Sequence, residues 1–211
     1  PAYILKEIKM VSDVIPVIIS DEVALDADGI SVAAAVGNNA ALVIGGALAD
    51  GGSVTNASGR QVTILSAGND SSKSFTVVGT DVNGSALTEA VTGANAGTAT
   101  SSGYFKTIAS ITAVGNPAGN VSAGINNNAL GVIFADRCRL QGFSVTSGGT
   151  AGTLNIRNEG GTGTELIRAR TIGTDSSAED PFIPSDGVLF KDGCFVTFVV
   201  GTVDLMMFYH A

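Results

Sequence analysis

Hydrophobic and polar residues alternate along most of the chain, and the spacing of three and four residues that marks a helix is almost absent. The clearest example is segment 73–80, in which Phe75 and Val77 fall on one face. Asn83-Gly84 comes next and predicts a type I′ hairpin turn, because both residue types tolerate a positive φ. Segment 86–92 then supplies the partner strand.

Similar short strands recur to the end of the chain, separated by turns rich in Gly, Asn and Asp. This spacing is typical of sandwiches and barrels. The sequence therefore predicts an all-β fold built from β-sandwich or jelly-roll modules. The further segments expected as strands are 62–65, 98–100, 104–114, 132–134, 138–145, 152–157, 165–170, 187–190, 194–199 and 203–209.

A change in composition divides the pattern into two parts. Segment 115–129 is small and polar, with Gly-Asn and Asn-Pro pairs that favour loops. We therefore expect two lobes, one over residues 31–118 and a second over residues 119–211.

The first thirty residues, 1–30, differ from both lobes. Segments 3–9 and 14–19 are apolar, and Pro16 restricts the second of them to an arm or an edge strand. Acidic residues follow. This favours an extended N-terminal arm that crosses onto a neighbouring molecule, or equally an ordinary edge strand followed by an acidic loop.

The chain carries few charges. Charged residues make up 14% of the sequence, against about 25% in a typical soluble protein. The formal net charge is −8, and no basic stripe interrupts it. Dense neutralisation of phosphates is therefore not expected, which excludes nucleic acid as a partner. The low charge favours a surface covered in part by neighbouring copies or other partners.

The sequence also predicts no export signal and no membrane partner. Segment 1–6 shows no basic stretch followed by an apolar one. The most apolar long stretch, 32–49, is interrupted by Asn38-Asn39 and by three glycines, whereas a spanning helix needs about 20 mainly apolar residues.

Candidate catalytic chemistry is scarce. His210 is the single histidine and the penultimate residue, which removes triads built on an internal imidazole. Asp26 and Asp28 begin a weak calcium-loop pattern whose later ligands are missing. A hydrolase using Glu89 and Glu165 remains an alternative, although sugar-stacking aromatics are few. We expect no catalytic residue, no cofactor and no metal.

The two cysteines, Cys138 and Cys194, lie outside any metal-ligand spacing. Each stands two residues after an aspartate and opens an apolar strand. The sequence leaves open whether they are two buried thiols or a disulfide, and the shared setting suggests that they are neighbours.

Two groups of residues are candidates for contacts between subunits. Arg157, Arg168 and Arg170 alternate with apolar residues, so they belong either to inter-subunit salt bridges with acidic loops or to a solvated sheet face. The other group opens the N-terminal arm and consists of Tyr3, Ile4 and Leu5.

Several segments resemble structural proteins of tailed-bacteriophage virions: closely over residues 59–111 and more loosely over residues 140–209. The residues that carry the resemblance lie in 59–70, 75–84, 87–93, 105–111, 152–157, 184–190 and 203–209. The resemblance implies a non-enzymatic capsid decoration (cement) protein of β-sandwich modules, and it brings no catalytic residues.

Such a protein would bridge major capsid subunits and contact copies of itself, and we expect it to form a homotrimer. It would be made in the host cytoplasm and end on the capsid surface of the virion. The alternative is a tail or head-to-tail component, including a tail-associated module that binds a host receptor or glycan.

Overall fold

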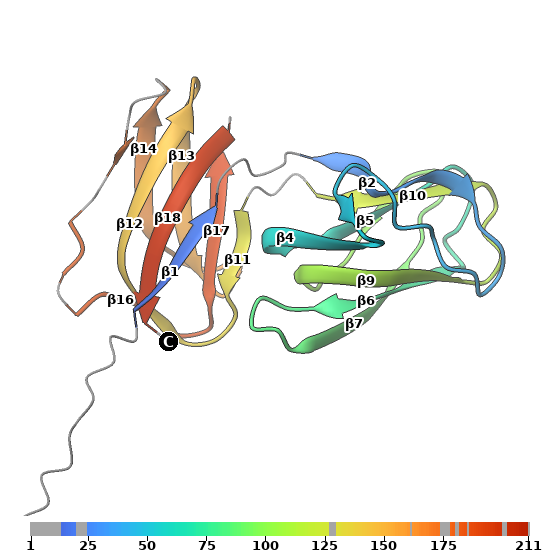
Figure 1. Cartoon of the computed structure of the whole chain (residues 1–211), viewed down its shortest axis with the longest axis horizontal. Coiled ribbons are helices and arrows are strands. Elements are labelled where there is room, and N and C mark those ends of the chain that lie inside the picture. Colours follow the sequence, from blue (N-terminus) through green and yellow to red (C-terminus); the bar gives the residue numbers. More distant parts are fainter. Residues whose placement is uncertain are drawn as a thin grey trace, which may run out of the picture.

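The computed structural model describes residues 14–19, 25–126, 130–160, 162–173, 178–179, 182–184, 186–199 and 202–210. Within these ranges the chain forms β-strands and no helix. Every pairing between these strands is antiparallel. The all-β prediction is therefore confirmed (Figure 1).

The strands follow one another with short connections. Their bounds are β1 (Val14–Ile19), β2 (Asp26–Ala35), β3 (Ala49–Asp50), β4 (Ser53–Arg60), β5 (Val62–Ser66), β6 (Ser74–Thr80), β7 (Ala86–Thr92), β8 (Thr98–Thr100), β9 (Phe105–Val114), β10 (Asn120–Ile125), β11 (Leu130–Phe134), β12 (Cys138–Gly148), β13 (Ala151–Asn158), β14 (Glu165–Ile172), β15 (Ala178–Glu179), β16 (Val188–Phe190), β17 (Cys194–Val199) and β18 (Thr202–His210).

The strands form three hydrogen-bonded sheets. A 5-stranded sheet has the order β1-β18-β12-β15, with β16 also paired to β12, and a 4-stranded sheet has the order β2-β10-β5-β8. A 9-stranded sheet runs β14-β13-β17-β11-β4-β9-β6-β7, with β3 paired to β4. Figure 1 shows one end of this long sheet beside β12 and β18 and the other end beside β2, β5 and β10.

Buried side chains form two clusters. The first core lies between the 4-stranded sheet and strands β4, β6, β7 and β9, and includes Ile64, Phe75 and Phe105. The second core lies between the 5-stranded sheet and strands β11, β13, β14 and β17, and includes Phe143 and Leu154. In both cores the alternation of the strands sends every second side chain inward.

The hairpin between β6 and β7 is confirmed, but its turn is not type I′. Gly84 has a φ of 81°, whereas Asn83 keeps a negative φ. The Asp81 carboxylate accepts hydrogen bonds from the backbone N–H groups of Asn83 and Ser85, both at 2.9 Å. This side-chain acceptor favours a wider turn, in which only the glycine needs the left-handed conformation.

Segment 120–125 packs in the first core, whereas the sequence analysis assigned it to a second lobe starting at residue 119. It forms β10, pairs with β2 and β5, and buries Val121 and Ala123. Its small polar residues favoured a loop, but they serve close packing: a Cβ at Gly124 would collide with the backbone carbonyl of Asp26.

Of the first 24 residues the structure describes residues 14–19. These residues form β1, which pairs with β18 of the same chain at the edge of the 5-stranded sheet. Tyr3, Ile4 and Leu5 lie outside the described residues, so their role in an arm stays a prediction.

Contacts also join the two halves of the 9-stranded sheet. Gly59 of β4 stands opposite Val132 of β11. The side-chain amide of Asn83 donates to Asp136 Oδ2 at 2.7 Å. The rings of Tyr104 and Phe195 meet edge to face, with centroids 5.2 Å apart. The two cores are therefore connected through packed side chains as well as through the chain itself.

Candidate functional site

One face of the 5-stranded sheet exposes apolar side chains at its edge. In β1 and β18, Ile18 stands opposite Met206 and Pro16 stands opposite Phe208. Ile18 is 68% exposed, Met206 39% and Phe208 37%. Cross-strand neighbours on one face lie in contact distance, so these side chains form a continuous surface. We call it the outer apolar face, and it consists of Val14, Pro16, Ile18, Met206 and Phe208.

The outer apolar face stays open because the next strand carries small residues. Gly142 of β12 pairs with Phe208, and Ser144 pairs with Met206. Neither side chain is large enough to cover its neighbour. Contiguous apolar surface of this kind is typical of a place where another molecule binds.

The edge of β1 is less suited to binding than its face. Pro16 has no N–H group, so an added strand would lack one of its ladder hydrogen bonds. Proline is one of the residues that protect edge strands from pairing with other chains. The face of the sheet is therefore the better candidate for a contact surface.

Two of the three candidate arginines, Arg157 and Arg168, form ion pairs with Glu165. Arg157 Nη2 lies 3.1 Å from Glu165 Oε2, and Arg168 Nε lies 2.8 Å from Glu165 Oε1. Arg170, which like Arg168 belongs to the edge strand β14, stands opposite Thr153 of β13. Glu165 therefore neutralises charge within this sheet, which the sequence analysis did not consider, and the role of the arginines between subunits stays a prediction.

Glu89 and Glu165, the acids considered for a hydrolase, both bind other groups of the chain: backbone N–H groups in the case of Glu89 and arginine side chains in the case of Glu165. Glu89 accepts hydrogen bonds from the backbone N–H groups of Ser102 and Gly103, both at 2.7 Å. Its carboxylate thus fixes the loop between β8 and β9. Glu165 forms ion pairs with Arg157 and Arg168. In the described part of the chain, no group of three or more His, Cys, Asp or Glu side chains is placed to hold a metal ion.

The two cysteines are neighbours in the second core. Both are buried free thiols. A hydrogen bond between them lowers the pKa of Cys138. The same hydrogen bond, together with burial, raises the pKa of Cys194 well above its usual value.

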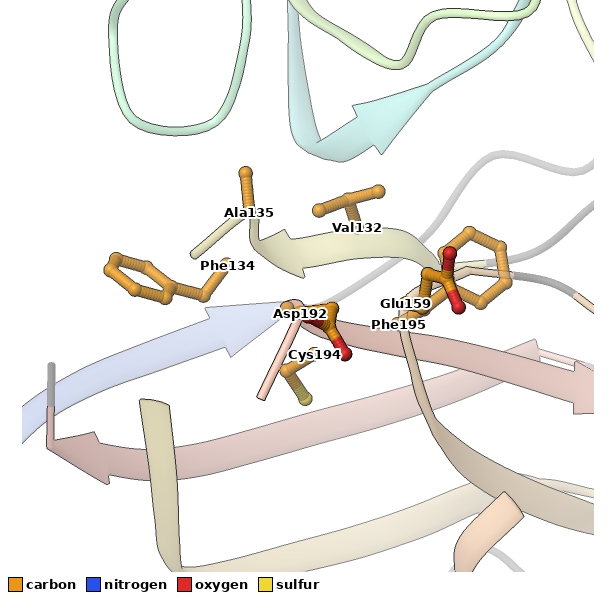
Figure 2. A pocket seen from close by; sticks show the side chains of 8 residues that line it. Val132, Phe134, Ala135, Glu159, Asp192, Cys194 and Phe195 are labelled. Carbon is orange, nitrogen blue, oxygen red and sulfur yellow. The ribbon is translucent and has the colours of Figure 1, made fainter. Parts of the chain in front are cut away.

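A cavity of about 170 Å³ lies beside Cys194 (Figure 2). Sites for drug-sized ligands usually measure about 300–1,000 Å³, so this cavity can admit only small molecules. Its lining is mostly apolar, with two carboxylates, and consists of Val132, Phe134, Ala135, Glu159, Asp192, Gly193, Cys194 and Phe195.

The sequence analysis did not find the outer apolar face, although a signal for it was present. Residues 205–209 are apolar without a break. A strand with one solvated face alternates, so an unbroken apolar run indicates that both faces of β18 meet apolar surroundings.

Among the described residues, no helix is long and apolar enough to cross a membrane.

Comparisons of the chain with protein-family models, with curated proteins and with solved structures gave no match. Its function is therefore argued from its own residues.

Proposed function

We propose that the chain is a non-enzymatic structural protein of a tailed-bacteriophage virion, a decoration (cement) protein that forms a homotrimer and bridges major capsid subunits. The observation that carries this proposal is the outer apolar face, which needs a covering partner. The resemblance of residues 59–111 to virion proteins points to the kind of assembly that supplies one.

The size of the outer apolar face suits a protein that binds at many points at once. Full burial of an apolar side chain contributes about 1.5–3 kcal/mol. The three largest members, Ile18, Met206 and Phe208, are only partly exposed, so their joint contribution is of the order of 2–5 kcal/mol. Association itself costs at least about 4 kcal/mol. A single copy would therefore bind weakly, and a trimer on a repeating shell would bind through the sum of its contacts.

We also propose that each core is a β-sandwich module. Two facing sheets fill each core from both sides, and the strands contribute alternate side chains. Tightly packed sheets resist deformation, which suits a protein that must hold shell subunits in place.

Light scattering on the purified protein tests the oligomer. The proposal predicts a mass three times that of one chain of 21.1 kDa. A monodisperse monomer that does not bind capsids would contradict it.

Co-sedimentation with expanded capsids stripped of decoration protein tests the place in the virion. We expect wild type to sediment with the shells and Ile18→Asn to remain in the supernatant. Leu166→Asn is the matched control, because Leu166 is also exposed but lies on β14, away from the outer apolar face. Recovery of the chain with purified tails, or binding to host cells or glycans instead of capsids, would overturn the decoration assignment in favour of a tail role.

A further inference from the structure

We infer that Cys138 and Cys194 are a site of reversible oxidation, at which one disulfide joins the two sheets of the second core. The inference does not depend on the proposed function. It rests on where the strands place the two thiols and on the cavity beside them.

The topology brings the cysteines together from different sheets. Cys138 opens β12 in the 5-stranded sheet, and Cys194 opens β17 in the 9-stranded sheet. Phe134, the last residue of β11, stands opposite Cys194. The chain then crosses to the other sheet in three residues, 135–137, and reaches Cys138. This short crossing keeps Cys138 beside the position that Cys194 occupies.

The local contacts favour a bond within the chain. Both thiols are free and buried, and they belong to the same cluster of apolar side chains; each of them shifts the pKa of the other. The chain has no other cysteine. A buried thiol cannot reach the thiol of a second protein chain, so its available partner is the other cysteine of the pair.

The cavity provides a route for a small oxidant. Cys194 contributes to its lining, and Ala135, Glu159 and Asp192 of the same lining are exposed residues, so the cavity reaches the surface. A water molecule occupies about 30 Å³ of liquid. Hydrogen peroxide is little larger and fits within about 170 Å³, whereas a tripeptide disulfide such as oxidised glutathione does not.

The oxidation by hydrogen peroxide balances in two steps. The sulfur of one cysteine of the pair, as thiolate, attacks one peroxide oxygen; the O–O bond breaks, and the departing hydroxide takes a proton to become water. The sulfur of the other cysteine then attacks this sulfenic acid, the S–S bond forms, and the hydroxyl leaves with the thiol proton as a second water. Two thiols are oxidised and one peroxide is reduced to two waters.

Native wild-type protein treated with hydrogen peroxide tests the inference. We expect both thiols to be lost when they are titrated after unfolding. We also expect one peptide pair that joins Cys138 to Cys194 and is lighter by two hydrogens than the two separate thiol peptides. A reductant should restore both thiols. The thermal midpoint should rise on oxidation, and oxidised glutathione should react more slowly than peroxide.

The variant Cys138→Ala is the control, and its thermal midpoint should not rise with peroxide. If this variant fails to fold, the thiol titration and the peptide measurement on wild type still show whether the Cys138–Cys194 disulfide forms. Two thiols that remain titratable after treatment, added oxygen without cross-linking, or disulfide-linked dimers would each overturn the inference.

Discussion

Phe195 tests whether the two halves of the structure support each other. Its flanking residues in β17, Cys194 and Val196, point into the second core, so the side chain of Phe195 points to the other face of the strand. Phe195 is nevertheless only 1% exposed, and it belongs to neither core. Its ring meets Tyr104, which comes from the first half of the chain. The burial of Phe195 therefore depends on the contact between the halves.

The structure gives the size of the effect expected for Phe195→Ala. Loss of a buried aromatic side chain removes about 1.5–3 kcal/mol of transfer free energy. Loss of the edge-to-face pair with Tyr104 removes about 0.5–1.5 kcal/mol more. The total, about 2–4.5 kcal/mol, agrees with the roughly 3–5 kcal/mol measured for truncation of buried Phe residues.

Urea unfolding followed by circular dichroism measures this loss. The matched control is Phe182→Ala, because Phe182 is 92% exposed, and we expect it to change the free energy of unfolding by less than about 0.5 kcal/mol. The reasoning would be refuted if Phe195→Ala lowered the free energy of unfolding no more than Phe182→Ala does.

Three further predictions follow from particular contacts. Glu89→Gln leaves one backbone N–H of the loop between β8 and β9 facing an amide N–H₂ group. The substitution should therefore lower the free energy of unfolding by about 1–2 kcal/mol in urea titrations. An unchanged urea midpoint would contradict the contact of the Glu89 carboxylate with both N–H groups. Burial, with a smaller contribution from the neighbouring cysteines, raises the pKa of Tyr209 above its usual value near 10.0. The neutral phenol of Tyr209 therefore contributes its full stabilisation below pH 10, and this stabilisation is lost as the pH rises through the folded-state pKa. Tyr209→Phe should flatten that alkaline loss in unfolding midpoints measured against pH, and a variant that follows the wild-type curve would contradict this cause. The Cys138–Cys194 disulfide would close a loop of about 57 residues, for which the loop-entropy model gives about 4 kcal/mol of stabilisation, measurable as a shift in the urea midpoint between oxidised and reduced protein.

The sequence predicted those elements whose signals are local. Strands β6 and β7 were found because their residues alternate and a glycine turn lies between them. Strand β10 was missed because Gly124 and its small neighbours are loop formers by local preference, and only the close approach of β2 explains them. In such a segment tertiary packing overrides local preference.

The candidate site shows the same limit. The cysteines could be suspected as neighbours from their similar settings, but their hydrogen bond depends on the crossing between two sheets. The partner of Arg157 and Arg168 is Glu165, which faces them through the register of β13 and β14 and through its position three residues before Arg168. The outer apolar face likewise needs the pairing of β1 with β18, two strands from opposite ends of the chain.

Methionine oxidation tests most directly whether the outer apolar face is covered in the assembly. Met206 lies on that face and is exposed, whereas Met207, the next residue, is buried and serves as an internal control. Brief peroxide treatment followed by mass spectrometry measures the sulfoxide at each position. We expect Met206 to be oxidised in the dissociated chain and protected in the assembled virion, with Met207 protected in both. Equal oxidation of Met206 in the dissociated and assembled forms would contradict the account.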